Sequence, residues 1–297
     1  MKGDLLVSAI GFGIVTASVL AVGAVGFTLQ FSVTNILNLA FGSVMTIAGF
    51  TAYALNARGV NIWLCLLVAG LAGGVLSVAL NAMLFAPLVR RGTKLFGMVI
   101  ITISVALILD HLVQAIVGPS FFSYRVSAGR TMHLGAMVFT TTELITIGIA
   151  VVAMLALHVA LKFTRFGKAM RAVATDPLLA RACGIRTHRV VNLAWFLSGV
   201  LAGMAGVILF IDTATFSATT GTEFLVIIIA AAVLGGVGHA YGAMLGALVV
   251  GIVSEIAAAL INPSLKEIAA FVLLVLVLLV RPRGILAEVA ANKEVVA

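Results

Sequence analysis

A few polar and ionisable side chains interrupt the long apolar stretches of this sequence, and they are the first candidates for chemistry. Asp110, His111 and Gln114 lie in one such stretch and Glu255 in another. Adjacent residues on a helix point about 100° apart, so Asp110 and His111 do not form a catalytic pair. Two interpretations of Asp110 stay open, a bond to a neighbouring helix or a place on a cavity. Glu255 is expected to be a structural group near a boundary.

Motifs for covalent or metal-dependent chemistry are absent from the sequence. It contains no nucleophile elbow, no set of metal ligands, no pair of catalytic carboxylates and no G-x-x-x-x-G-K-[ST] loop for ATP. Its two cysteines are too few for a metal site. We therefore expect a protein that is not an enzyme and that needs no metal and no cofactor.

The most specific local pattern lies in the basic segment 164–190. Asp176 before Pro177 is typical of a helix start, because Asp caps free N–H groups and Pro suits the first helical position. Gly184 is typical of a helix end. The pattern predicts a short helix over 177–183 that is fixed at both ends.

That predicted helix is half apolar, although it lies among basic residues. Leu179, Ala182 and Ile185 recur every three residues and can share one face. Charges that only orient a chain in a membrane would not need a capped, half-apolar helix. We therefore predict that this face contacts another protein.

The composition indicates which kind of protein carries these residues. Hydrophobic residues make up 63% of the chain and charged residues 9%, whereas soluble domains have about 45–50% and about 25%. No charged residue occurs in the ranges 5–57 and 190–211. A chain with so little polar surface cannot cover a core in water. The sequence therefore predicts an all-α bundle of transmembrane helices.

Since a span needs about 20 apolar residues, we predict about 8–9 spans. They form a single transmembrane domain over residues 1–297. The apolar stretches lie near 5–29, 35–57, 62–86, 95–117, 143–163, 190–211, 224–260 and 265–280.

Basic residues gather in three loops between these stretches, and by the positive-inside rule all three face the cytoplasm. This placement also argues against nucleic acid as the partner of a chain with a net charge of +8. The loops near 118–142 and 212–222 are then external. Cys65 falls in a span and Cys183 in a basic loop, so we expect no disulfide. The basic loop residues are Arg90, Arg91, Lys94, Lys162, Arg165, Lys168, Arg171, Arg181, Arg186, Arg189, Arg281 and Arg283.

Two segments, near 35–45 and 235–243, are expected to be broken or re-entrant. The roughly 40 residues between two external positions, 222 and 264, must cross an even number of times. Glycines near their middle each weaken a helix by roughly 1 kcal/mol relative to alanine. The side of the N-terminus depends on whether 35–57 crosses completely, and the sequence leaves that open.

Irregular backbone at membrane depth is tolerated where protein or a water-filled cavity covers it. We therefore assign the two breaks, together with the acidic residue of the fourth span, to a translocation pathway. The assigned residues are Asn38, Gly42, Asp110, Gly235, Gly236 and Gly238.

Four segments resemble, in the same order, signatures of the permeases of branched-chain amino-acid ABC importers, the LivH-like family. The first is NILNLAFG at 35–42, and the second runs from RAVA at 171–174 to GI at 184–185. The third is AVLGGVG at 232–238 with GAMLG at 242–246, and the fourth is LVRPRGI at 279–285. Each match is short, but the four together extend over most of the chain.

The resemblance implies a transmembrane subunit of an ATP-driven importer in the bacterial inner membrane. It would move branched-chain amino acids or related small organic solutes by alternating access. The implied partners are two cytoplasmic ATPase subunits, a second permease subunit, an external solute-binding protein and membrane lipid. The resemblance assigns coupling to the ATPases to Arg171, Asp176, Pro177, Leu179, Ala180, Arg181, Ala182, Gly184 and Ile185.

The sequence departs from the family pattern at two positions. Phe41 stands where the early signature usually has His, so a role of that His cannot be assigned here. Leu178 stands where the coupling segment usually has Glu, so a more apolar contact with the ATPase is expected. Two other functions remain open. A transporter driven by an ion gradient would need several ionisable groups at mid-membrane, and a channel-type subunit would not need the docking helix.

Overall fold

The structure, a computed structural model, describes residues 2–126, 129–134, 137–262, 265–281 and 284. Within this part, six helices are long and apolar enough to cross a membrane. They are α1 (Lys2–Thr34), α3 (Ile62–Leu80) with its continuation to Arg90, α5 (Leu95–Val117), α6 (Thr141–Phe163), α9 (Thr187–Asp212) and α11 (Ala240–Leu260). The predicted all-helical bundle is confirmed.

Three shorter helices complete the bundle in the predicted stretches. They are α2 (Phe41–Asn56), α10 (Thr220–Gly235) and α12 (Lys266–Val280). The stretch 224–260 forms α10 and α11 with a break at Gly236–His239, which agrees with the predicted hairpin or broken helix. Of these two helices, α11 is long enough to cross a membrane and α10 is shorter. Counted with these three, the number of spans is roughly the one predicted.

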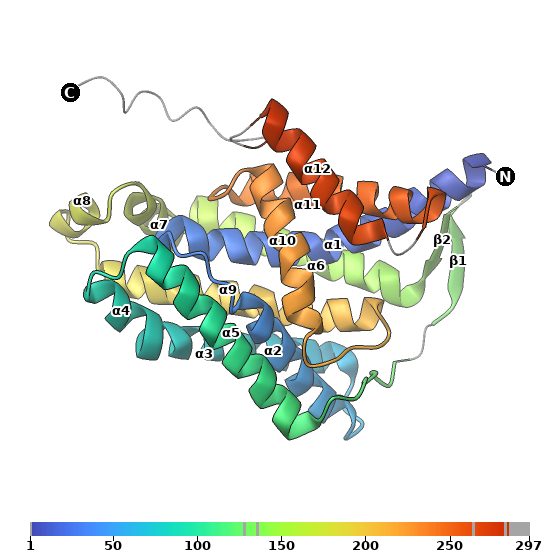
Figure 1. Cartoon of the computed structure of the whole chain (residues 1–297), viewed down its shortest axis with the longest axis horizontal. Helices are drawn as coiled ribbons and strands as arrows, with labels where there is room; N and C mark the ends of the chain where they lie inside the picture. The colour runs from blue at the N-terminus through green and yellow to red at the C-terminus, as the bar shows by residue number, and fades with distance from the viewer. Residues whose placement is uncertain (1, 127–128, 135–136, 263–264, 282–283, 285–297) are drawn as a thin grey trace.

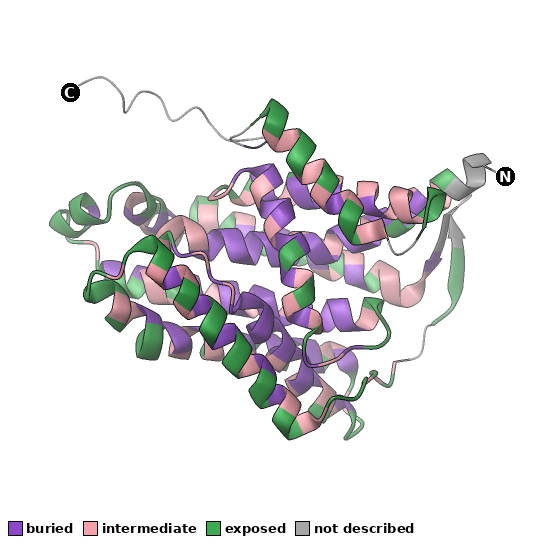
Figure 2. Ribbon diagram, viewed as in Figure 1, coloured by how far each residue is buried: buried purple, intermediate pink, exposed green. Residues whose placement is uncertain are grey.

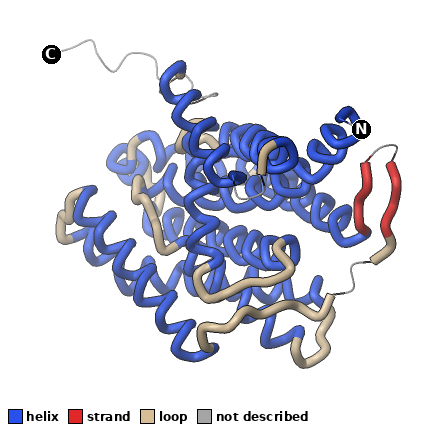
Figure 3. Tube along the Cα trace, turned by 45° about the vertical axis from the view of Figure 1, so that its right-hand side comes forward, coloured by secondary structure: helices blue, strands red, loops and turns tan. Residues whose placement is uncertain are grey.

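The two ends of the bundle differ in structure, as Figure 1 shows, and in the charge of their residues. One end, here called the basic end, carries three features: the loop after α4 (Ala86–Arg90), α7 (Arg165–Thr175) and α8 (Pro177–Ala182). The opposite end, here called the hairpin end, carries the start of α1 and two strands (Figure 3). Strands β1 (Thr131–Leu134) and β2 (Met137–Thr140) pair antiparallel within the predicted loop 118–142.

The segment 35–57 crosses toward the hairpin end. There the side chain of Asn56, at the end of α2, accepts a hydrogen bond from the backbone N–H of Arg125 at 2.8 Å. Since α1 also starts at that end, the N-terminus lies opposite the basic end (Figure 1).

Small residues bring the central helices into close contact. A Cβ added to Gly73 of α3 would lie 3.3 Å from the Cα of Gly203 in α9, and one added to Gly13 of α1 would lie 2.8 Å from the Cα of Ile252 in α11. Such contacts substitute for the hydrophobic effect, which does not join helices in lipid. Figure 2 shows that α9 and much of α1 are buried, whereas α5 and α12 expose apolar faces.

An aromatic cluster closes the hairpin end. The rings of Phe210 and Phe216 stack at 4.2 Å with an interplanar angle of 7°. Phe50 packs edge-on against Phe216 at 5.4 Å. Phe122 and Phe216 also exchange backbone hydrogen bonds of 2.8 and 2.9 Å, which fix the loop after α5 to the loop after α9.

Candidate functional site

The short helix α8 has the predicted cap at each end. Oδ1 of Asp176 accepts from the backbone N–H groups of Leu178 at 2.8 Å and Leu179 at 3.0 Å. At the other end Gly184 adopts φ +82°, its N–H bonds to the carbonyl of Arg181, and the N–H of Ile185 bonds to that of Ala180. These two bonds form a Schellman motif, which satisfies carbonyls at the helix end.

The residues of α8 divide into an outward and an inward face. Leu178 and Leu179 are 75% and 62% exposed, and Ala182 is exposed as well. Ala180 is buried, so it anchors the helix to the bundle instead of contributing to the outward face. The prediction that Leu179, Ala182 and Ile185 share one outward face is therefore wrong for Ile185. Ile185 follows the left-handed Gly184, is half-buried and packs against the core.

A second helix, α7, lies in the segment that was predicted as a basic loop before α8. It is amphipathic, and its Gly167, Met170 and Val173 are buried at three-residue spacing. Thr164 caps it by accepting from the N–H of Gly167 at 3.1 Å. Nη1 of Arg171 donates to the carbonyl of Leu161, at the end of α6, at 2.6 Å. Packing of α7 thus supports α8 on the bundle.

The first predicted break occupies residues 35–40, between α1 and α2. Asn35 adopts φ +54°, an uncommon conformation for a residue with a side chain. Asn38 accepts from the N–H of Ala40 at 3.1 Å and donates Nδ2–H to Oε1 of Gln30 at 3.2 Å. Ser198 of α9 donates to the same Gln30 oxygen at 3.3 Å. The break is therefore held by side chains of α1 and α9.

A polar cluster of α2, α5 and α10 lies beyond this break. Oδ2 of Asp110 accepts from Oγ1 of Thr222 at 2.9 Å, and Oγ of Ser43 lies 3.4 Å from the same hydroxyl. Oδ1 of Asp110 is buried without a protein hydrogen-bond partner. Gly42 permits this meeting, because a Cβ there would lie 2.7 Å from the Cα of Thr222.

The three glycines of the second break differ from one another. Gly235 is packed, since an added Cβ would lie 2.7 Å from the N of Ala243. Gly236 adopts φ +105°, and a Cβ added to Gly284 would lie 2.6 Å from its N. Gly238 adopts φ +96°, has open space beside it, and lines a cavity of about 740 Å³ at the basic end. Of these three, only Gly238 has the surroundings expected of a pathway residue.

The predicted pathway residues thus fall into two groups. Asn38, Gly42 and Asp110 lie near the break at 35–40 and the start of α10, and the three glycines lie at the other end of α10. The 16 residues of α10 separate the groups by about 24 Å. Gln30 and Thr222 were not identified from the sequence. Each has a hydrogen-bond partner far along the chain, and no pattern of neighbouring residues indicates it.

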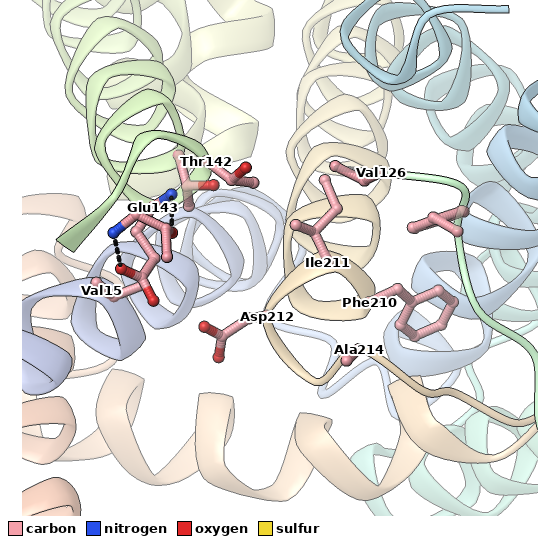
Figure 4. A pocket seen from close by; sticks show the side chains of 11 residues that line it. Val15, Val126, Thr142, Glu143, Phe210, Ile211, Asp212 and Ala214 are labelled. Carbon is pink, nitrogen blue, oxygen red and sulfur yellow. Dashed lines mark hydrogen bonds between the residues drawn. The ribbon is translucent and has the colours of Figure 1, made fainter. Parts of the chain in front are cut away.

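A separate pocket of about 270 Å³ lies at the hairpin end, and Asp212 and Glu143 line it (Figure 4). Glu143 also accepts from the N–H of Thr140 at 2.7 Å in a capping box of α6. Tyr124 lines the pocket and donates its hydroxyl to the carbonyl of Gly49 at 2.9 Å. Burial raises the pKa of Tyr124 above its ordinary value, so the phenol stays a neutral donor.

Glu255 has the structural surroundings predicted for it. It accepts from Oγ1 of Thr16 at 2.6 Å and pairs with Lys266 at the start of α12. The two cysteines are free thiols, Cys65 buried and Cys183 exposed.

Comparison with known proteins identifies relatives along nearly the whole chain. A family model described as the permease component of the branched-chain amino acid transport system matches residues 9–278. The high-affinity branched-chain amino acid transport system permease protein LivH of Escherichia coli K12 is 30% identical over 296 residues, which cover 95% of each chain. The high-affinity branched-chain amino acid transport system permease protein BraD of Pseudomonas aeruginosa is 26% identical over 95% of each chain.

Two further matches have other names. The ribose import permease protein RbsC of Escherichia coli K12 is 27% identical over 80% of this chain and 74% of its own length. Among solved structures, a chain of PsaBC from Streptococcus pneumoniae in complex with Fab matches with a TM-score of 0.53 and 15% identity. The match covers 95% of this chain and 97% of that one, and at this identity it supports the fold alone.

Proposed function

Because this chain belongs to the family of branched-chain amino acid transport system permeases, we propose that it is the transmembrane subunit of an ATP-driven importer. Its solutes are branched-chain amino acids or related small organic molecules, a range that includes the ribose named for one relative. The chain itself catalyses no reaction, and partner subunits hydrolyse ATP. It resides in the bacterial inner membrane with its basic end in the cytoplasm.

The single observation that carries this proposal is the outward face of α8. Leu178 and Leu179 are large apolar side chains on a helix that lies outside the bundle, at the extreme of the basic end (Figure 1). Lipid does not cover them if the cap and the basic residues around them lie in water. An apolar groove on an ATPase subunit is the partner that fits, and two ATPases and a second permease subunit complete the importer. An external solute-binding protein delivers the solute to the hairpin end.

A movement of α8 reaches the pathway through packed contacts. The Asp176 cap and the Gly184 turn fix the helix at both ends, so it moves as a rigid body with α7. α7 packs against α1, α6 and α9. The Gln30 side chain then links α1 and α9 to Asn38 at the first break. In this proposal ATP-driven closure of the ATPases shifts these helices and opens the break alternately to either side.

The test places a charge on the outward face of α8. Ala182→Glu and Leu179→Glu should each remove the ATPase subunits during purification and abolish uptake, because an unpaired charge in an apolar contact costs several kcal/mol. Leu179→Met, which keeps an apolar side chain of similar volume, should retain both. The variants should still insert into the membrane in normal amounts. Retention of bound ATPase and full uptake by both Glu variants would overturn the assignment of α8.

A further inference from the structure

The proposed coupling does not explain what occupies a basic cavity at the basic end. The cavity has a volume of about 740 Å³ and lies between α1, α6, α7 and α11. Lys162, Arg171 and His239 supply positive or donor groups. The hydroxyls of Ser32 and Thr175 also line the cavity, and each donates to a carbonyl of its own helix. None of the residues that line it, all within the described chain, is acidic. This chemistry fits an anion with several oxygen acceptors, such as a phosphate.

An apolar groove adjoins this cavity on the side of the bundle. The groove has a volume of about 510 Å³ and runs between α1, α6 and α11. Leu155, Leu245 and Leu248 line it and are exposed, so it opens toward the surrounding lipid. His158 and Tyr241 line both the groove and the cavity, and the Tyr241 hydroxyl lies 2.8 Å from Nδ1 of His158. The two hollows therefore adjoin at this pair.

We propose that the cavity and the groove together bind one anionic phospholipid from the leaflet at the basic end. Its phosphate lies beside Arg171 and Lys162, and one acyl chain lies in the groove. Charge complementarity and the position of the groove beside the cavity favour this occupant, because a free phosphate would fill only the basic part. Basic pockets between transmembrane helices have the chemistry that recognises anionic headgroups.

The position of this site suggests what the lipid does. The cavity is lined on one side by Arg171 and Thr175 of α7 and on another by Gly238 and His239 at the second break. A bound phosphate would join α7 to the start of α11 by charge-assisted hydrogen bonds. The lipid would thus hold α7 against the bundle. This inference depends on the membrane location alone and stands whether or not α8 binds an ATPase.

The test measures lipid retention by native mass spectrometry of the full-length protein, purified in mild detergent with any subunits that remain bound to it. Phosphatidylglycerol and zwitterionic phosphatidylethanolamine are added at equal concentration. The wild type should retain more phosphatidylglycerol than phosphatidylethanolamine. The double variant Lys162→Gln with Arg171→Gln should lower its occupancy at least about tenfold, since each basic residue near the surface contributes about 1 kcal/mol. Arg171→Lys, which keeps the charge, should retain the lipid.

Two matched controls separate the site from general basicity and from general contact with lipid. Arg165→Gln with Lys168→Gln removes two charges from α7 outside the cavity and should leave retention unchanged. Val151→Trp fills the groove and should lower retention, whereas Val159→Trp, on the same helix outside it, should not. Equal retention of both lipids, or equal losses in the two double variants, would overturn the proposal. Displacement of the lipid by millimolar inorganic phosphate, with Val151→Trp having no effect, would assign the cavity to a free anion instead.

Discussion

Asn38 donates its side-chain N–H to Oε1 of Gln30 at 3.2 Å, and this bond ties the first break to the helix that precedes it. Because Ser198 of α9 donates to the same oxygen at 3.3 Å, one buried amide joins three parts of the bundle. Nε2 of Gln30 has no protein partner and is buried. The network is thus only partly satisfied, and a buried polar group without a partner is costly in a low-dielectric interior.

Removal of the Asn38 amide should weaken both the fold and transport. Asn38→Ala should lower the free energy of unfolding by about 1–3 kcal/mol, because it deletes the side chain that fixes the break. Uptake should fall as well. Thermal unfolding in detergent and solute uptake by cells measure the two effects. Ser18→Ala is the control, since that hydroxyl bonds only to the carbonyl of Ile14 on its own helix. Equal effects of the two variants would contradict a special role for Asn38.

Replacement of Asp110 separates a hydrogen-bonding role from an ion-relay role. Asp110→Asn keeps an oxygen that accepts from Thr222, so at least half of the uptake should remain. Asp110→Ala leaves the Thr222 hydroxyl without this partner and should lower uptake strongly. Thr222→Val, which removes the donor, should resemble Asp110→Ala. A complete loss of uptake in Asp110→Asn, with normal amounts of protein in the membrane, would instead favour a transporter driven by an ion gradient.

The features that could be predicted from sequence are those that residues a few positions apart determine. The Asp176 cap, the Pro177 start and the Gly184 stop depend only on neighbouring backbone groups, and the structure has all three. The lengths of the apolar stretches likewise predicted the long transmembrane helices. The amphipathic face of α7, with Met170 and Val173, was present in the sequence, but its basic residues led to its interpretation as a loop.

The remaining features depend on partners far along the chain. Thr222 reaches Asp110 across 112 positions, and no local spacing indicates that pair. Ala180 and Ala182 look alike in the sequence, yet packing buries the first and exposes the second. The same holds for Gly235 and Gly238, which differ in their backbone conformation and in what lies beside them.

Substitutions at these two glycines should therefore have different consequences. Gly235→Leu should reduce the amount of protein in the membrane, because even a Cβ there would lie 2.7 Å from the N of Ala243. Gly238→Leu has room for its side chain, at a cost of about 1–2 kcal/mol for the left-handed backbone. It should leave protein amounts nearly normal and impair uptake. Quantitative immunoblots of membranes, with uptake assays in parallel, measure both. Similar amounts of the two variants would show that the tight packing at Gly235 is dispensable.

The aromatic cluster at the hairpin end should contribute strongly to stability. Phe216 is fully buried and stacks on Phe210, so Phe216→Ala should cost about 3–5 kcal/mol. Phe121→Ala provides the matched control, because Phe121 is 77% exposed. The unfolding temperatures of the two purified variants in detergent are compared with that of the wild type. If Phe121→Ala lowers the unfolding temperature as much as Phe216→Ala does, the stacked rings contribute no more to stability than other apolar surface.

The orientation of the bundle can be tested with the thiols that the chain already has. Cys183 is exposed at the end of α8, whereas Cys65 is buried and can be replaced by Ser. If the basic end faces the cytoplasm, a membrane-impermeant thiol reagent should leave Cys183 unlabelled in intact cells and label it after lysis. Thr215→Cys, in the exposed loop between α9 and α10 and in a background without Cys183, should react in intact cells. Thr187 is a poor reporter, because it is buried beside Arg181.

The opposite labelling pattern would have a definite meaning. Reaction of Cys183 in intact cells, with protection of Thr215→Cys until lysis, would place α8 outside the cell, where no ATPase subunit can reach it. The coupling role of α8 would then fail, and so would the assignment of the lipid to the cytoplasmic leaflet. Lipid binding itself would survive, because it depends on the basic cavity and its groove and not on the side they face. The expected pattern would instead place the outward face of Leu178 and Leu179 in the compartment that supplies ATP.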